Sequence, residues 1–335
     1  MDLSTRYLGL ELRNPLVASA SPLSNTVDGV RRLADAGVGA VVLYSLFEEQ
    51  LRREAAVNAA LADAGTESFG ESLSYFPPAT DTSPGPRRYL DLLERAAAAV
   101  DIPVIASLNG VTTGGWTDYA AALEQAGAAA IELNIYNLPG GPVFTSTDVE
   151  QRHVAILTTV KAVVSVPVAV KLSPYFSSVG EMVQRLDRAG ADGLVLFNRF
   201  LQPDIDPETL TVTSGFGLSS PAEARLPRAW IALLAGRVRA SLAATTGVED
   251  AADVARYLLA GADVVMTASA LLRHGPGYAS VVLRELSAWM DRKGFGSLAE
   301  LRGLLSVPAG TDEAAYERAG YVTVLQAANR GHGPW

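Results

Sequence analysis

The sequence predicts an α/β protein whose strands and helices alternate as a (β/α)8 TIM-type barrel. A phrase of small residues recurs at 36–40, 126–130, 189–193 and 260–264, and each copy ends an amphipathic segment and opens an apolar run. Glycine readily ends a helix in the left-handed conformation, and the small residues after it let the chain turn at once into a strand. Open parallel sheets use such joints too, so the number of strands decides between the two architectures.

Eight short apolar runs alternate with helical segments, which is the number of strands that closes a barrel. The expected strands are residues 16–20, 40–45, 103–108, 130–135, 167–172, 193–198, 238–245 and 263–268. The expected helices are residues 27–36, 116–126, 147–163, 179–189, 227–234, 248–260 and 278–293.

Two long connections interrupt this alternation, at residues 48–88 and 200–225. Both follow strands, and the loops that follow the strands form the catalytic face of such a barrel. We expect the barrel to occupy residues 1–305. The remaining residues, 306–335, are expected to form a C-terminal extension whose helix, at 313–329, serves packing or subunit contacts rather than catalysis.

The composition excludes several classes of partner and site. The 335 residues carry a net charge of −9 without a cluster of Lys or Arg, which disfavours nucleic acid and anionic membranes as partners. Cysteine is absent, so this chain has no disulfide, no thiolate nucleophile and no iron–sulfur cluster of its own. The three histidines, His153, His274 and His332, follow no ligand spacing, so no metal site is expected. No apolar stretch reaches the length of a membrane span, and we expect a soluble, cytoplasmic protein.

Lys171 lies near the end of an apolar run that begins at Val168 and stops before Ser173-Pro174. A short, continuous apolar run predicts a strand that is buried on both faces. A lysine there needs a negative partner, because removing an ammonium from water costs several kcal/mol. Glu132, two residues before Asn134 and on the same face of the preceding strand, is the expected protein partner. The alternative is a structural lysine that is ion-paired or whose amine reaches solvent.

The other predicted strand ends are rich in hydroxyl and amide groups, and in a barrel they converge on one mouth. Neither a pair of carboxylates nor a Ser–His–Asp arrangement occurs among them. Thr246-Gly247 and Ala268-Ser269 follow the seventh and eighth strands, where barrels commonly bind phosphate. We therefore expect a ligand that carries a phosphate, although the glycine-rich fingerprint of dinucleotide-binding folds is absent.

Several segments together resemble the dihydroorotate dehydrogenase family, most closely its soluble, cytoplasmic branch. They are Asn14-Pro15-Leu16-Val17, Glu132-Leu133-Asn134-Ile135, Val170-Lys171-Leu172-Ser173-Pro174-Tyr175-Phe176, Phe216-Gly217-Leu218-Ser219-Ser220-Pro221, Thr246-Gly247-Val248, and Ala270-Leu271 with Gly275-Pro276. Their order and spacing hold over residues 6–305. The phrase that contains Lys171 is the most specific of them.

The resemblance implies a flavin-dependent dehydrogenase of CH–CH bonds that acts in pyrimidine biosynthesis on dihydroorotate or a related planar substrate. It implies FMN in the barrel mouth, with Lys171 at the pyrimidine edge of the isoalloxazine, where a cation stabilises the anionic reduced flavin. By the same resemblance, the residues that contact FMN are Ser19, Ala20, Ser21, Ser45, Lys171, Asn198, Thr246, Gly247, Ala268 and Ser269. Asn134 and Asn198 are expected to hold the substrate, and a homodimer and a redox partner protein are candidate assemblies.

The sequence departs from the family at the position of the catalytic base. The family has Cys or Ser there, whereas this chain has Asn137, and a neutral amide does not remove a proton. Tyr136, or a residue of the Thr145-Ser146 loop, is the candidate substitute. Tyr44 replaces the family's second lysine, and the family's asparagines are missing from the segments 79–84 and 137–141.

Two other functions therefore stay open at the level of sequence. One is a non-catalytic or regulatory barrel that binds an anionic ligand. The other is a flavin-free lyase or isomerase that uses Lys171 as a Schiff-base amine or as an electrostatic anchor.

Overall fold

The computed structural model describes residues 1–49, 86–110, 116–136, 144–199, 204–213, 217–308 and 310–329, and these contain a closed barrel of eight parallel strands. Each strand pairs in parallel with its neighbours, and the pairing of the first strand with the last closes the ring. The barrel strands are β3 (Leu16–Ala18), β4 (Ala40–Val42), β6 (Val104–Asn109), β7 (Ala130–Asn134), β8 (Val168–Leu172), β9 (Gly193–Leu196), β12 (Ser241–Ala244) and β13 (Val264–Thr267). Seven lie within the predicted runs, and β6 extends one residue beyond its run, to Asn109. The predicted fold class is confirmed.

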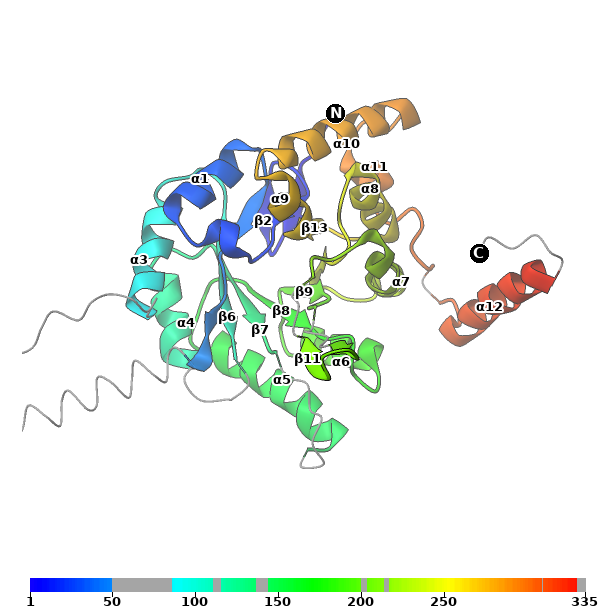
Figure 1. Cartoon of the computed structure of the whole chain (residues 1–335), viewed down its shortest axis with the longest axis horizontal. Helices are drawn as coiled ribbons and strands as arrows, with labels where there is room; N and C mark the ends of the chain where they lie inside the picture. Colours follow the sequence, from blue (N-terminus) through cyan, green and yellow to red (C-terminus); the bar gives the residue numbers. More distant parts are fainter. Residues whose placement is uncertain are drawn as a thin grey trace, which may run out of the picture.

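Helices surround the strands on the outside of the barrel (Figure 1). The seven predicted helices are present as α1 (Val27–Asp35), α4 (Trp116–Gln125), α5 (Ser146–Lys161), α6 (Val179–Arg188), α7 (Arg225–Leu234), α8 (Ala251–Ala260) and α10 (Tyr278–Lys293). The sequence reasoning missed α3 (Pro86–Ala97), α9 (Ser269–His274) and α11 (Leu298–Leu301). The prediction of a connection up to residue 88 is wrong from Pro86 onwards. The buried residues of α3, such as Tyr89, Leu92, Leu93 and Ala96, follow helical spacing and could have revealed it.

The barrel interior is filled by small residues of the strands and by one hairpin of the N-terminal segment. The hairpin consists of β1 (Thr5–Tyr7) and β2 (Leu10–Leu12), paired antiparallel. Tyr7 and Leu8 pack in the same buried cluster as the inward-facing residues of the strands, such as Val17, Ala169 and Val195. The N–H of Leu8 donates to Ser241 Oγ at 3.1 Å, which ties the hairpin to the start of β12. Sequence reasoning did not predict this plug.

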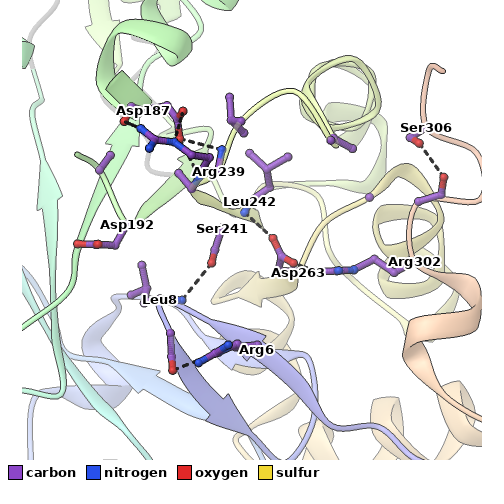
Figure 2. A pocket seen from close by; sticks show the side chains of 18 of the residues that line it. Arg6, Leu8, Asp187, Asp192, Arg239, Ser241, Leu242, Asp263, Arg302 and Ser306 are labelled. Atoms are coloured by element: carbon purple, nitrogen blue, oxygen red, sulfur yellow. Dashed lines mark hydrogen bonds and ion pairs between the residues drawn. The ribbon is translucent and has the colours of Figure 1, made fainter. Parts of the chain in front are cut away.

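The plug closes the barrel at the ends where the strands begin, and a polar cavity of about 910 Å³ lies beside it (Figure 2). Its aspartates hold the starts of neighbouring strands. Asp192 Oδ2 accepts from Val168 N at 2.7 Å, and Asp263 Oδ2 accepts from Leu242 N at 2.7 Å. Both aspartates end an Ala-Gly-Ala-Asp copy of the repeated phrase. Because these carboxylates also pair with Lys161 and Arg302, this end of the barrel is structural.

Two features lie outside the alternation. The connection at 200–225 carries an antiparallel hairpin of β10 (Asp204–Asp206) and β11 (Thr211–Thr213). The predicted C-terminal helix is present as α12 (Glu313–Asn329) and stands apart from the barrel in Figure 1. The domain boundary at residue 305 stays a prediction. Among the described residues, no helix is long and apolar enough to cross a bilayer.

We expect Gly193→Ala to destabilise the fold by unseating the plug. An added Cβ would lie 2.4 Å from Leu8 Cδ2 and 3.4 Å from Tyr7 Cε2, and overpacking of a filled core costs about 1–3 kcal/mol. Gly180→Ala is the matched control, because its Cβ would meet only Trp230 at an ordinary 3.9 Å on helix α6. Urea unfolding of both variants measures the difference. Equal stability of Gly193→Ala and wild type would contradict the tight seating of the hairpin.

Candidate active site

Lys171 and Glu132 form an ion pair inside the barrel. In the pairing of β7 with β8, Asn134 lies opposite Lys171, and Glu132 lies one inward position earlier, opposite Ala169. Lys171 Nζ is 3.7 Å from Glu132 Oε1, and the two side chains are 9% and 1% exposed. The partner expected for Lys171 from the sequence is therefore the one that the structure pairs with it.

Three asparagines lie near this lysine at the mouth. Asn109, Asn134 and Lys171 occupy one register level across β6, β7 and β8. Asn198, just past β9, donates through Nδ2 to Asn134 Oδ1 at 2.6 Å. The backbone N–H of Asn198 donates to Leu172 O at 2.7 Å, which fixes its position relative to the strand that carries Lys171.

A cavity of about 710 Å³ opens above these amides. It is lined by Ala20, Ser21, Pro22, Asn25, Tyr44, Ser45, Phe47, Arg88, Asn109, Asn134, Tyr136, Asn198 and Arg199. Six of these residues had been predicted as site residues from the sequence: Ala20, Ser21, Ser45, Asn134, Tyr136 and Asn198. Sequence reasoning missed Arg88 and Arg199, because it read only the strand ends and both arginines lie outside them.

Helix α3 shapes one wall of this cavity. Its Tyr89 hydroxyl accepts from Ser107 N at 2.9 Å, and the Ser107 and Ser45 Oγ atoms are 2.9 Å apart. The rings of Tyr44 and Tyr89 meet edge to face at 5.1 Å. Burial raises the pKa of Tyr44, while the nearby Arg88 guanidinium acts to lower it. A helix that the sequence reasoning missed thus holds Ser45 and Tyr44 at the rim.

The two predicted phosphate loops come together at the ends of β12 and β13. Ser219 joins them, since its Oγ accepts from Gly247 N at 3.3 Å and donates to Ser269 Oγ at 2.9 Å. Thr246 and Gly247 both have positive φ, at 76° and 69°. A Cβ on Gly247 would lie 2.6 Å from Ser220 O, so only glycine fits there. These loops do not line the 710 Å³ cavity, but Thr246 Oγ1 donates to Phe197 O at 3.2 Å, next to Asn198.

The other predicted site residues do not line this cavity, or lie outside the described residues. Ser19 is buried, and its N–H donates to Thr267 O at 3.0 Å, which joins the first and last strands at the mouth. Asn137 and the segments 79–84 and 137–141 lie outside the described residues. Thr145 is the N-cap of α5, where its side chain and Asp148 form a capping box, which gives this loop a structural role. In the described part of the chain, no three His, Asp or Glu side chains gather as metal ligands.

The family model for dihydroorotate dehydrogenase matches residues 82–290. The chain belongs to the dihydroorotate dehydrogenase family. Three similar proteins all bear the name catalytic subunit of dihydroorotate dehydrogenase B (NAD(+)). That of Methanothermobacter thermautotrophicus is 27% identical over 320 residues, or 90% of this chain and 98% of the relative. The protein from Halalkalibacterium halodurans is 33% identical over 227 residues, which cover 66% of this chain and 74% of the relative. The protein from Listeria welshimeri is 33% identical over 208 residues, which cover 60% of this chain and 68% of the relative.

Membership of the dihydroorotate dehydrogenase family confirms the resemblance read from the sequence and the predicted enzyme class, a dehydrogenase that acts on CH–CH bonds. The modest identities fit a divergent member. The motif from Val170 to Phe176 is held from behind by α5, since the His153 ring meets the Phe176 ring edge to face at 5.1 Å. His153 is buried, and its Nδ1 lies 2.8 Å from Val149 O.

We expect His153 to make the fold less stable below neutral pH. Burial lowers the pKa of His153 below its ordinary 6.5, so the folded protein binds fewer protons than the unfolded chain. Stability then falls as the pH drops below 6.5, until the pH passes the lowered pKa, with a slope of at most about 1.4 kcal/mol per pH unit. Urea unfolding between pH 7.5 and 5 compares wild type with His153→Met. A wild type that loses no more stability than the variant over this range would contradict the assignment.

Proposed function

We propose that this chain is an FMN-dependent dehydrogenase that oxidises dihydroorotate to orotate, or a related planar ring, in pyrimidine biosynthesis. The observation that carries the proposal is the buried ammonium of Lys171, in register with Asn134, which lines a cavity of amides and hydroxyls. Lys171 itself does not line that cavity. Family membership supports the same reaction class. When bound, FMN supplies the acceptor for hydride; the chain supplies position, charge and exclusion of water.

Lys171 would contact the pyrimidine edge of the flavin, where negative charge develops during reduction. The residues present fit this group, because a cation at the mouth level lies beside two asparagines that present both donors and acceptors. Its pairing with Glu132 is the arrangement of an electrostatic anchor rather than of an amine nucleophile. This argues against the flavin-free lyase or isomerase that the sequence left open.

Thr246, Gly247, Ala268 and Ser269 would hold the FMN phosphate. The positive φ of Thr246 and Gly247 and the close packing of Gly247 on Ser220 and Ala224 fix the backbone of this loop beside the start of α9, where free N–H groups suit an anion. The hydroxyls of Ser219 and Ser269 add donors at the same place. Ser19, Ala20, Ser21 and Ser45 would lie beside the ring system, next to the phosphate loops, because Ser19 N donates to Thr267 O at the end of β13.

Asn134 and Asn198 would bind the amide edges of a planar substrate. The rim adds two cations of different character: Arg199 is paired with Glu223 at 2.8 Å, whereas Arg88 makes no ion pair in the described part of the chain. We assign Arg88 to the carboxylate of the substrate. Since the amide of Asn137 does not accept a proton, proton removal falls to another group, and Tyr136 in the cavity wall is the candidate.

A partner protein would carry the electrons away. The relatives are named catalytic subunits of an enzyme that uses NAD(+), which supports a second subunit for this chain as well. Without cysteine, an iron–sulfur cluster would have to reside on that partner. A homodimer of the barrel is part of the same proposal.

Purified protein should show the absorbance of oxidised flavin, or acquire it when FMN is added. Gly247→Ala should weaken FMN binding at least about tenfold, because its Cβ collides with backbone and its φ of 69° is strained for alanine. Gly277→Ala is the control, since its Cβ would meet nothing within 4 Å. Titration of FMN fluorescence measures the affinities. A colourless wild type that ignores added FMN would reject the proposal.

Anaerobic mixing with dihydroorotate should bleach the flavin. Arg88→Gln should raise the dihydroorotate concentration for half-maximal bleaching about 10- to 100-fold, the loss expected when a hydrogen bond to a charged group is removed. Arg284→Gln, on helix α10 far along the chain, controls for lost positive charge. If FMN binds but dihydroorotate does not bleach it, the substrate is wrong while the flavin assignment holds.

A further inference from the structure

Three polar atoms below Lys171 have no hydrogen-bond partner in the described part of the chain: both carboxylate oxygens of Glu132 and the hydroxyl of Tyr7. Both side chains are 1% exposed. Leaving one buried polar group unsatisfied costs about 1–3 kcal/mol, and more when the group is charged. Native folds rarely keep three such atoms together, so something at this place must bind them.

Tyr7 reaches the same level of the barrel as Glu132. Glu132, Ala169 and Gly193 are in register across β7, β8 and β9. A Cβ built on Gly193 would lie 3.4 Å from Tyr7 Cε2, so the Tyr7 ring stands against this level. Burial and the charge of Glu132 together raise the pKa of Tyr7 well above 10. The Tyr7 hydroxyl is therefore protonated at neutral pH and needs a hydrogen-bond acceptor. The nearby Glu132 carboxylate needs hydrogen-bond donors.

The strand side chains beside Glu132 are small, and the plug packs against them. Ala169 and Gly193 lie in register with Glu132, whereas most barrels fill such a layer with bulky residues. Leu8 and Tyr7 of the plug lie over Gly193. Lys171 Nζ, at 3.7 Å from Glu132 Oε1, is beyond the distance of a direct charge-assisted hydrogen bond. The Lys171 ammonium and the Tyr7 hydroxyl are thus donors near a buried carboxylate, and neither makes a direct hydrogen bond to it.

We propose that Tyr7, Glu132 and Lys171 enclose a site for ordered water, and that Tyr7 and Glu132 are positioning residues that hold the Lys171 ammonium through it. Buried water typically makes about three hydrogen bonds to otherwise unsatisfied groups, and the four acceptor directions of the carboxylate suit one or two molecules. The water site does not depend on the proposed function; its effect on flavin does.

Glu132 also limits how strongly Lys171 can favour a reduced, anionic flavin. A buried carboxylate at ion-pair distance opposes part of the ammonium's charge. Glu132→Gln keeps the shape of the side chain and removes that opposition. The mouth then becomes more positive, and it should bind reduced flavin more tightly relative to oxidised flavin.

The first test needs no flavin. Thermal unfolding is measured for flavin-free wild type, Tyr7→Phe, Glu132→Gln and the double variant. A water-bridged hydroxyl predicts that Tyr7→Phe lowers Tm by about 2 °C or more, and that the loss shrinks when Glu132 is already Gln. An unpaired hydroxyl predicts an equal or higher Tm and additive effects, which would overturn the water site. If Glu132→Gln does not fold, the double variant Glu132→Gln/Lys171→Met removes both charges of the ion pair at once. The effect of Tyr7→Phe is then measured in that double variant.

The second test uses FMN-loaded protein. Glu132→Gln should raise the ratio of reduced to oxidised FMN affinity about tenfold, which is a rise of about 30 mV for a two-electron couple. Glu150→Gln is the matched control, because it removes a carboxylate from a partly buried pair with Arg185 at 2.8 Å on the helical layer. An unchanged potential in Glu132→Gln would overturn the charge-opposing role. If wild type binds no FMN, the proposed function fails, and the unfolding cycle still decides the water site.

Discussion

A buried ammonium and a buried carboxylate inside a barrel can only be understood together. Either charge alone would cost several kcal/mol to remove from water, and the apolar strands around them offer no compensation. The register of β7 and β8 brings Lys171 and Glu132 within 3.7 Å, and the rest of the mouth is arranged around that pair. Asn134 and Asn109 share the level of Lys171, and Asn198 bonds to Asn134.

The two ends of the barrel handle charge in opposite ways. At the plugged end, Asp192 accepts from Val168 N and pairs with Lys161. Asp263 accepts from Leu242 N and pairs with Arg302 (Figure 2). Both charges are therefore neutralised within the fold. At the mouth, hydroxyls, amides and Arg88 line an open cavity. Charges that are paired within the protein stabilise the scaffold. Polar groups that are held in place but exposed to a cavity are the ones that can bind a ligand.

Much of this arrangement could be predicted because it depends on local pattern. Buried parallel strands appear as continuous apolar runs, so all eight were found, and Lys171 was conspicuous because it interrupts one of them. The plug could not be found in this way. Its residues 5–12 form two very short strands, and their burial depends on Gly193, far along the chain, leaving room for Leu8. Arg88 was missed for a similar reason: its place at the mouth depends on how α3 packs against Ser107 through Tyr89, not on a strand end.

The combination of residues at the mouth says more about the ligand than about the reaction. Under the proposed function, the cation, the two asparagines and the two loops after β12 and β13 are all binding groups. Proton removal needs one group of suitable basicity at one point, and the resemblance to the family places an amide, Asn137, at that point. A scaffold that keeps its electrostatic anchor while changing its base can still accept hydride on a bound cofactor, because the anchor acts on the cofactor and the base acts only on the substrate. On the proposed function, the group that replaces the base therefore decides the substrate chemistry, while Lys171 and Glu132 together set the charge that the cofactor meets.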